Sequence, residues 1–233
     1  MNTGRVPAEA ETPDVADWEA QLQREERRYR DGEGRLDDAR DEDARQRQLT
    51  RLGNAASGAG LALLMRGRRE EAGTWFVRAA ERYRQSFADA PPDSWGRPIG
   101  ALKALVLAGD LPAAEGAARW ALDAGAAEAR SPIGRYAAAL ALLVLGRDGE
   151  ARQHADAIRV RDDFPAAVGD ALAYISAGDS VGYTEAVEAV LDSFETRDDF
   201  LEGIRVADTV LVLQGLAERR GLAAELSSPV LPA

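Results

Sequence analysis

The repeat that decides the fold is clearest in residues 132–160, which read PIGRYAAALALLVLGRDGEARQHADAIRV. Two segments, 132–145 and 148–160, carry apolar residues at helical spacing. Proline opens the first segment, and a turn from Leu145 to Asp148 that contains Gly146 separates it from the second. This stretch therefore predicts a helical hairpin.

The hairpin pattern recurs at a nearly fixed period. Pro98, Pro132 and Pro165 are 34 and 33 residues apart, and each opens an apolar stretch that ends in a glycine-containing turn. Such a period is typical of stacked helical hairpins, in which each unit buries its apolar face against its neighbours. The expected pairs are 98–108 with 112–124, 132–145 with 148–160, and 165–177 with 182–196. A last helix, 205–220, has no partner and is expected to cap the stack. Because no segment reads as a strand, the predicted fold is all-α.

Three parts are expected along the chain. Residues 1–47 form a charged N-terminal helical arm, which begins with Thr12-Pro13-Asp14 as an N-cap followed by proline. Residues 48–226 form the helical-hairpin repeat domain, which opens with an apolar segment and the amphipathic helix of residues 68–88. Residues 227–233 form an extended tail, since its prolines exclude a helix.

Composition limits the function classes. The net charge is −11 and Lys103 is the sole lysine, so the surface should repel phosphate backbones and no nucleic acid is expected as a partner. The absence of cysteine excludes disulfides, thiolate metal sites and a cysteine nucleophile. Neither a signal peptide nor an apolar span of membrane length is visible. We therefore expect a cytoplasmic protein that has no membrane partner.

Small and large apolar residues recur at fixed offsets from the turn glycines. They are Gly60, Leu63, Ala72, Phe76 and Ala79 around Gly67; Leu102, Leu105, Ala114, Ala118 and Ala121 around Gly109; and Ala139, Leu142, Ala151, Ala155 and Ile158 around Gly146. This pattern resembles the tetratricopeptide repeat, whose small residues let two paired helices approach closely. The later units depart from it: Ala118 and Ala155 replace an aromatic residue, and Tyr183 stands where a small residue is expected. The resemblance implies a stack of antiparallel hairpins.

A second resemblance covers most of the chain. A Trp/Phe-bearing helix is followed by small helical pairs, the stretch Ser193 to Leu201, a last helix from Val206 to Arg220, and the tail Ser228-Pro229-Val230-Leu231-Pro232. This order is similar to the immunity 49 family of polymorphic toxin systems. The resemblance implies a cytoplasmic helical protein that neutralises the toxin encoded by a neighbouring gene.

Catalytic and metal-binding patterns are not found in the sequence. His154 is the only histidine, so a zinc site would need carboxylates for its other ligands. The acidic groups Asp162-Asp163 and Asp198-Asp199-Glu202 lie at predicted helix ends or turns, where we interpret them as caps. Phosphate-loop, dinucleotide and nucleophile-elbow motifs are absent. We expect no enzyme activity, no cofactor and no metal.

Five residues are candidates for partner binding. Trp95 and Arg97 pair two residue types that are enriched in binding hot spots; alternatively, Trp95 folds back on the start of the next helix. Arg135, Tyr136 and Tyr174 lie on first helices of hairpins, which line the inner groove of such a stack, or they serve in packing between repeats. Asp208 lies among apolar residues, so it either needs a buried cation as partner or stands in the first turn of the last helix.

Three functions follow from these observations. The leading hypothesis is a non-enzymatic scaffold that binds a protein partner, which the second resemblance identifies as a toxin domain. The alternative is a tetratricopeptide-like regulatory or assembly module that binds a peptide, or that forms homo-oligomers through an exposed face such as Trp75 and Phe76. The third, an enzyme with a helical pocket, lacks any visible pairing of base and nucleophile.

Overall fold

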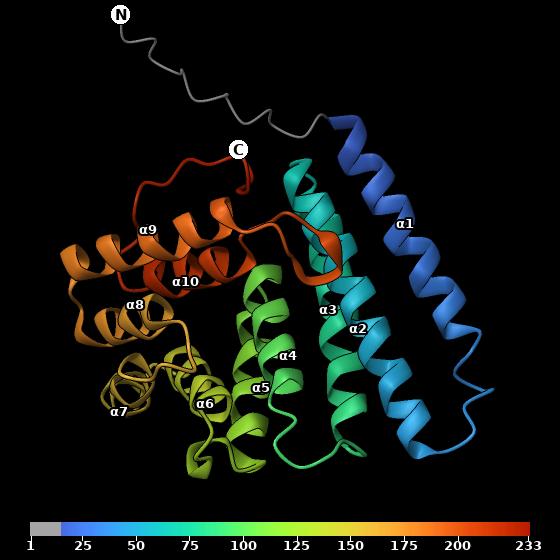
Figure 1. Ribbon diagram of the computed structural model, residues 1–233, viewed down its shortest axis with the longest axis horizontal. Helices are drawn as coiled ribbons and strands as arrows, with labels where there is room; N and C mark the ends of the chain where they lie inside the picture. The colour runs from blue at the N-terminus through green and yellow to red at the C-terminus, as the bar shows by residue number, and fades with distance from the viewer. Residues whose placement is uncertain (1–14) are drawn as a thin grey trace, which may run out of the picture.

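A computed structural model describes residues 15–233, and within them the chain is all-helical (Figure 1). The α-helices are α1 (Val15–Glu33), α2 (Glu42–Met65), α3 (Arg69–Phe87), α4 (Gly96–Ala108), α5 (Leu111–Asp123), α6 (Pro132–Val144), α7 (Asp148–Arg159), α8 (Ala166–Ala177), α9 (Ser180–Thr196) and α10 (Asp208–Glu218). Two 3₁₀ turns, η1 (Ala126–Glu128) and η2 (Leu201–Gly203), join them. None of these helices is long and apolar enough to cross a membrane.

Glycines close the hairpins that the period predicted. Gly67, Gly109, Gly146 and Gly178 separate the helices of the pairs α2/α3, α4/α5, α6/α7 and α8/α9, with φ of 71°, 71°, 70° and 69°. This left-handed conformation is strained for residues that carry a Cβ, which explains why glycine stands at every turn. The predicted all-α stack of successive hairpins is therefore confirmed.

Small residues allow the paired helices to approach closely. In α2, Gly60 faces the ring of Phe76 on α3, where a Cβ would lie 2.6 Å from the phenyl Cε1. Gly53 faces Tyr83 in the same way, at 2.8 Å. Phe76 and Tyr83 are consequently buried between the two helices. The amphipathic helix predicted over residues 68–88 is α3, and it packs on α2 through its apolar face.

The N-terminal helix is part of the packed structure. Trp18, Leu22 and Tyr29 on α1 are buried, and α1 packs along α2. The expected boundary between residues 47 and 48 falls inside α2, which runs without a break from Glu42 to Met65. The N-cap expected at Thr12-Pro13-Asp14 lies outside the described residues. In the part that is described, the charged residues 36–47 divide into a turn and the first turn and a half of α2.

Residues 227–233 are non-helical, as predicted, and so are residues 222–226 before them; this whole stretch, 222–233, is the C-terminal tail and is fixed to the last two helices. The side-chain amide of Gln214 on α10 donates to the Ala224 carbonyl (2.6 Å) and accepts from the Ala224 amide (3.1 Å). The hydroxyl of Tyr183 on α9 donates to the same amide oxygen (2.7 Å). Further on, Val230 is buried and its carbonyl accepts from the Ala207 amide. These contacts hold the tail against the helices.

Candidate partner-binding site

The inner face of the stack is formed by the first helices of the hairpins. Successive first helices contact each other, α2 with α4, α4 with α6 and α6 with α8. The last helix, α10, closes the stack from this side, since it packs on α4 and α8 as well as on α9 (Figure 1). Most of the inner groove is therefore filled by the chain itself, and two hollows remain beside the N-terminal end of α10.

The first hollow, the α2–α4 hollow, has a volume of about 330 Å³. Polar groups from four helices line it, and Leu201 lies at its edge with 70% of its surface exposed. The polar lining residues are Thr50, Asn54, Ser57, Tyr83, Ser94, Arg97, Lys103 and Asp208. Such convergence of polar groups on a concave surface is typical of binding sites.

A short hydrogen-bond chain orders the α2 side of this hollow. The Tyr83 hydroxyl donates to Asn54 Oδ1 (2.9 Å), and Asn54 Nδ2 donates to the Glu202 carboxylate (2.9 Å). Burial, and then the negative charges of Asp208 and Glu202, raise the pKa of Tyr83, which stays a neutral donor. These two hydrogen bonds fix the orientation of the Asn54 amide, with its oxygen toward Tyr83 and its nitrogen toward Glu202.

Lys103 and Asp208 form an ion pair at the boundary between the two hollows. The Lys103 ammonium lies 2.5 Å from Asp208 Oδ2 and donates to Thr209 Oγ1 (3.1 Å). Asp208 lines the α2–α4 hollow and Thr209 lines the other one. Asp208 is also the first residue of α10, so both sequence interpretations hold: it has a cation as partner, and it stands in the first turn.

Arg97 is the most unusual group of the α2–α4 hollow. Its Nη2 donates to the Gln46 side chain, whereas its Nε is buried and has no hydrogen-bond partner among the described residues. Burial lowers the pKa of Arg97, and no carboxylate of the described chain forms an ion pair with it. The guanidinium lines the hollow with a charge that has no counterion in the described chain, so a carboxylate oxygen brought by a partner would be stabilised here.

The second hollow, the α6–α8 hollow, is apolar and measures about 450 Å³. Ile133 lies at its edge, 41% exposed, and the rings of Tyr136 and Phe164 pack inside it with centroids 5.5 Å apart. Its lining residues are Pro132, Ile133, Tyr136, Asp163, Phe164, Pro165, Val168 and Thr209. A hollow of this composition suits an apolar side chain of a partner.

The five candidate residues from the sequence do not form one site. Trp95 is buried, packs against Phe87 and Gly134, and donates from Nε1 to Asp93 (3.2 Å). These contacts lie at the end of α3 and the start of α6 and not at the start of α4, so Trp95 serves in packing between helices and is not exposed as a binding residue. Tyr136 is likewise buried; its hydroxyl pKa is raised by that burial, and it reaches a partner only through the α6–α8 hollow.

The other candidates are half-buried and lie apart. Tyr174 packs on Gly182 of α9, and the Arg159 guanidinium from α7 lies 5.4 Å from its ring, an arrangement that serves packing between helices. Arg135 lies beside His154, whose pKa is lowered by burial and then by the Arg135 charge. Arg97 alone among the five lines a hollow with a charge that forms no ion pair among the described residues.

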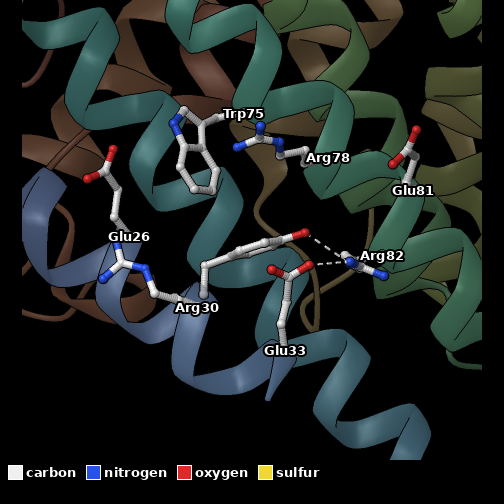
Figure 2. Close-up of a pocket in the computed structure, with 8 residues that line it drawn as sticks. Glu26, Arg30, Glu33, Trp75, Arg78, Glu81 and Arg82 are labelled. Carbon is white, nitrogen blue, oxygen red and sulfur yellow. Dashed lines mark hydrogen bonds and ion pairs between the residues drawn. The ribbon is translucent and has the colours of Figure 1, made fainter. Parts of the chain in front are cut away.

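A further cleft of about 500 Å³ lies between α1 and α3. Figure 2 shows Trp75, Arg78, Glu81 and Arg82 of α3 facing Glu26, Arg30 and Glu33 of α1. Tyr29 packs edge-on against Trp75 at 5.2 Å and accepts from Arg82 Nε (3.0 Å). Phe76, expected on an exposed face, is instead fully buried, so only Trp75 of that pair reaches this cleft.

The described residues show no cluster of metal-ligating side chains. No group of three histidine, cysteine or acidic residues is close enough to hold a metal ion within residues 15–233. Glu202, interpreted from the sequence as a cap, instead pairs with Arg28 and Asn54, contacts that no local sequence signal indicates.

Comparison with known proteins does not assign the chain to a family. No protein-family model matches the chain, and no curated protein or solved structure matches it significantly. The tetratricopeptide-like and immunity 49 resemblances stay predictions.

Proposed function

We propose that this chain is a non-enzymatic, cytoplasmic scaffold that binds a protein partner at the two hollows beside α10. The observation that carries the proposal is the combination of exposed apolar side chains with an unsatisfied cation. Leu201 and Ile133 lie at the edges of the hollows, and Arg97, which lines one of them, forms no ion pair among the described residues. Apolar and arginine side chains next to preformed hollows are the features that give binding energy at interfaces.

The partner class follows from these surfaces and from the sequence. One hollow accepts an apolar side chain, the other an apolar side chain next to an oxygen acceptor, and the net charge of −11 would speed the encounter with a basic partner. A toxin domain, the partner implied by the immunity 49 resemblance, is the occupant that we propose. Binding would mask the toxin, with no reaction on the part of this chain.

Co-expression tests this function. The toxin-like product of an adjacent gene should arrest growth when expressed alone, and growth should recover when this chain is present. Leu201→Asp should abolish the recovery, because it places a charge at the edge of the α2–α4 hollow. Val181→Asp is the matched control, since Val181 is also 70% exposed but lies on α9, away from both hollows. Recovery that is equal for both variants would place the binding surface elsewhere, and absence of recovery by the wild type would remove the function.

The alternative, self-association, is supported by the α1–α3 cleft. Charges of both signs surround the half-buried Trp75 there, and such a surface can complement itself across a two-fold axis. Light scattering tests it: a dimer that Trp75→Ala dissociates is expected, and a monomer at all concentrations would exclude it.

A further inference from the structure

The segment that joins α9 to α10 lies on α1 and α2 like a bound peptide. Residues 200–207, the crossing segment, pass from the end of α9 across to α2 and return to α10 (Figure 1). Apart from the short turn η2 the segment has no helix, yet its apolar residues Phe200, Ile204, Val206 and Ala207 are buried. The segment is therefore held by packed apolar side chains although it has almost no secondary structure of its own.

The carboxylate of the crossing segment enters a preformed cationic site. Glu202 accepts from Asn54 Nδ2 (2.9 Å) and pairs with Arg28, and its backbone carbonyl accepts from Arg24 Nη2 (2.8 Å). Both guanidinium groups are positioned independently of Glu202, because the fully buried Glu25 binds Arg24 Nε (3.0 Å) and Arg28 Nη1 (2.7 Å). The two arginines and the Glu25 carboxylate together carry one net positive charge. This charge is available to a second carboxylate, which in this structure is that of Glu202.

The aliphatic side chain two residues later fits against a glycine. Ile204 is buried on α2 at Gly58, where an added Cβ would overlap Ile204 Cδ1. Gly58 is helical and closes no turn, so its lack of a side chain serves this close approach. The receiving surface therefore consists of a carboxylate site, Arg24, Arg28 and Asn54, followed by an aliphatic site at Gly58.

We propose that this surface is a peptide-binding site and that the crossing segment occupies it as an internal ligand. The partner that it fits is an extended polypeptide with a carboxylate followed two residues later by an aliphatic side chain, as in Glu202 and Ile204. This inference rests on the proposed function, because its ligand is a protein chain. The element that such a chain would displace is the crossing segment. Asn54 lines the α2–α4 hollow as well as the carboxylate site, so the two surfaces are continuous.

The internal ligand is held by its covalent connection as well as by contacts. A segment tethered at both ends has an effective concentration of about millimolar, so a free peptide at micromolar concentration competes poorly with it. Glu202 also has φ of 57°, a left-handed conformation that is unfavourable for a residue with a side chain. That strain favours release once a competing chain fills the site.

The experiment uses the full chain and a fluorescein-labelled peptide of residues 198–208, DDFLEGIRVAD, measured by fluorescence anisotropy. The released variant Glu202→Gln/Ile204→Ala weakens the internal ligand without altering the receiving surface. It should bind the peptide at least about 10-fold more tightly than the wild type, because its site is open for a larger fraction of the time. Addition of Arg28→Gln should abolish binding, whereas the control Arg30→Gln, also on α1 but without contact to Glu202, should not. A peptide that carries the same Gln and Ala changes should not bind.

Two results would overturn the inference. One is a released variant with wild-type circular dichroism that does not bind the peptide. The other applies even where that variant does not fold. Unlabelled peptide at several times the effective concentration of the tethered segment, about millimolar, should speed hydrogen exchange of residues 200–207 in the wild-type protein, and unchanged exchange would overturn the inference. Either result can coexist with recovery from a toxin, so failure of this inference is distinguishable from failure of the proposed function.

Discussion

The ammonium of Lys103, the sole lysine, lies 2.5 Å from the Asp208 carboxylate and joins α4 to the first residue of α10. Both side chains are largely buried. The cost of breaking this pair should therefore lie between that for an exposed surface pair and that for a fully buried pair. It is one of the polar contacts that position α10; at the other end of the helix Arg219 Nη1 donates to the Val144 carbonyl of α6 (3.0 Å).

Breaking this pair should destabilise the fold. Asp208→Asn leaves the Lys103 charge without a counterion, and we expect a loss of about 1–3 kcal/mol in the free energy of unfolding. Urea denaturation measures it. The control is Arg119→Gln, which breaks an exposed pair with Glu115 on α5 and should change stability by less than about 0.5 kcal/mol. Equal effects of the two changes would show that Lys103 and Asp208 act only as a surface pair.

Two glycine substitutions should have opposite signs. Gly60→Ala places a methyl group 2.6 Å from Phe76 and should cost about 1–3 kcal/mol through overpacking. Gly116→Ala, in the interior of α5 with no atom within 4 Å of the new Cβ, should stabilise by about 0.5–1 kcal/mol. Thermal denaturation of both proteins checks the prediction. A neutral Gly60→Ala would contradict the close approach of α2 and α3.

Stability should depend on pH through Glu202. Burial alone would raise the pKa of this carboxyl, but the hydrogen bonds from Asn54 and Arg28 and the Arg28 charge outweigh it, so the pKa lies below its ordinary value of 4.5. A carboxyl whose pKa is lowered by folding stabilises the protein above the unfolded-state pKa and loses that effect as the pH falls through the folded-state pKa. The carboxylate should therefore contribute about 1–2 kcal/mol at pH 7.

The measurement is the difference in unfolding free energy between the wild type and Glu202→Gln from pH 7 to pH 3. It should be constant at neutral pH and shrink below about pH 4.5, since protonation makes the two side chains alike. If the difference in unfolding free energy is unchanged at pH 3, the charge of Glu202 is not its cause.

The C-terminal tail should loosen when Gln214 is removed. Gln214→Ala deletes the hydrogen bonds to Ala224 and Tyr183, which should cost about 1–3 kcal/mol and raise hydrogen exchange in residues 222–231. Hydrogen-exchange mass spectrometry measures this. Gln23→Ala, which removes an exposed side-chain contact within α1, is the control and should leave the tail protected. Unchanged exchange in the Gln214 variant would show that the remaining contacts, such as the burial of Val230 and the hydrogen bond from Ser228 to Glu195, are enough to retain the tail.

The sequence predicted only part of the candidate site. Arg97 was identified by residue type and does line a hollow, whereas Trp95 and Tyr136, chosen on the same grounds, are buried in packing between helices. Residue type cannot separate these outcomes, because tryptophan and tyrosine are favoured both in binding hot spots and in cores. Glu202 was missed because its partners Arg28 and Asn54 lie 174 and 148 residues away along the chain.

The sequence by itself determined the hairpins. Apolar residues at helical spacing and turn glycines at Gly67, Gly109, Gly146 and Gly178 are local signals, because periodicity and backbone sterics act within a few residues. The tertiary structure alone decided what fills the inner face. The paths of residues 200–207 and α10 depend on Glu202 meeting Arg28 and on Asp208 meeting Lys103, and such long-range charge contacts exist only once the stack has brought distant helices together.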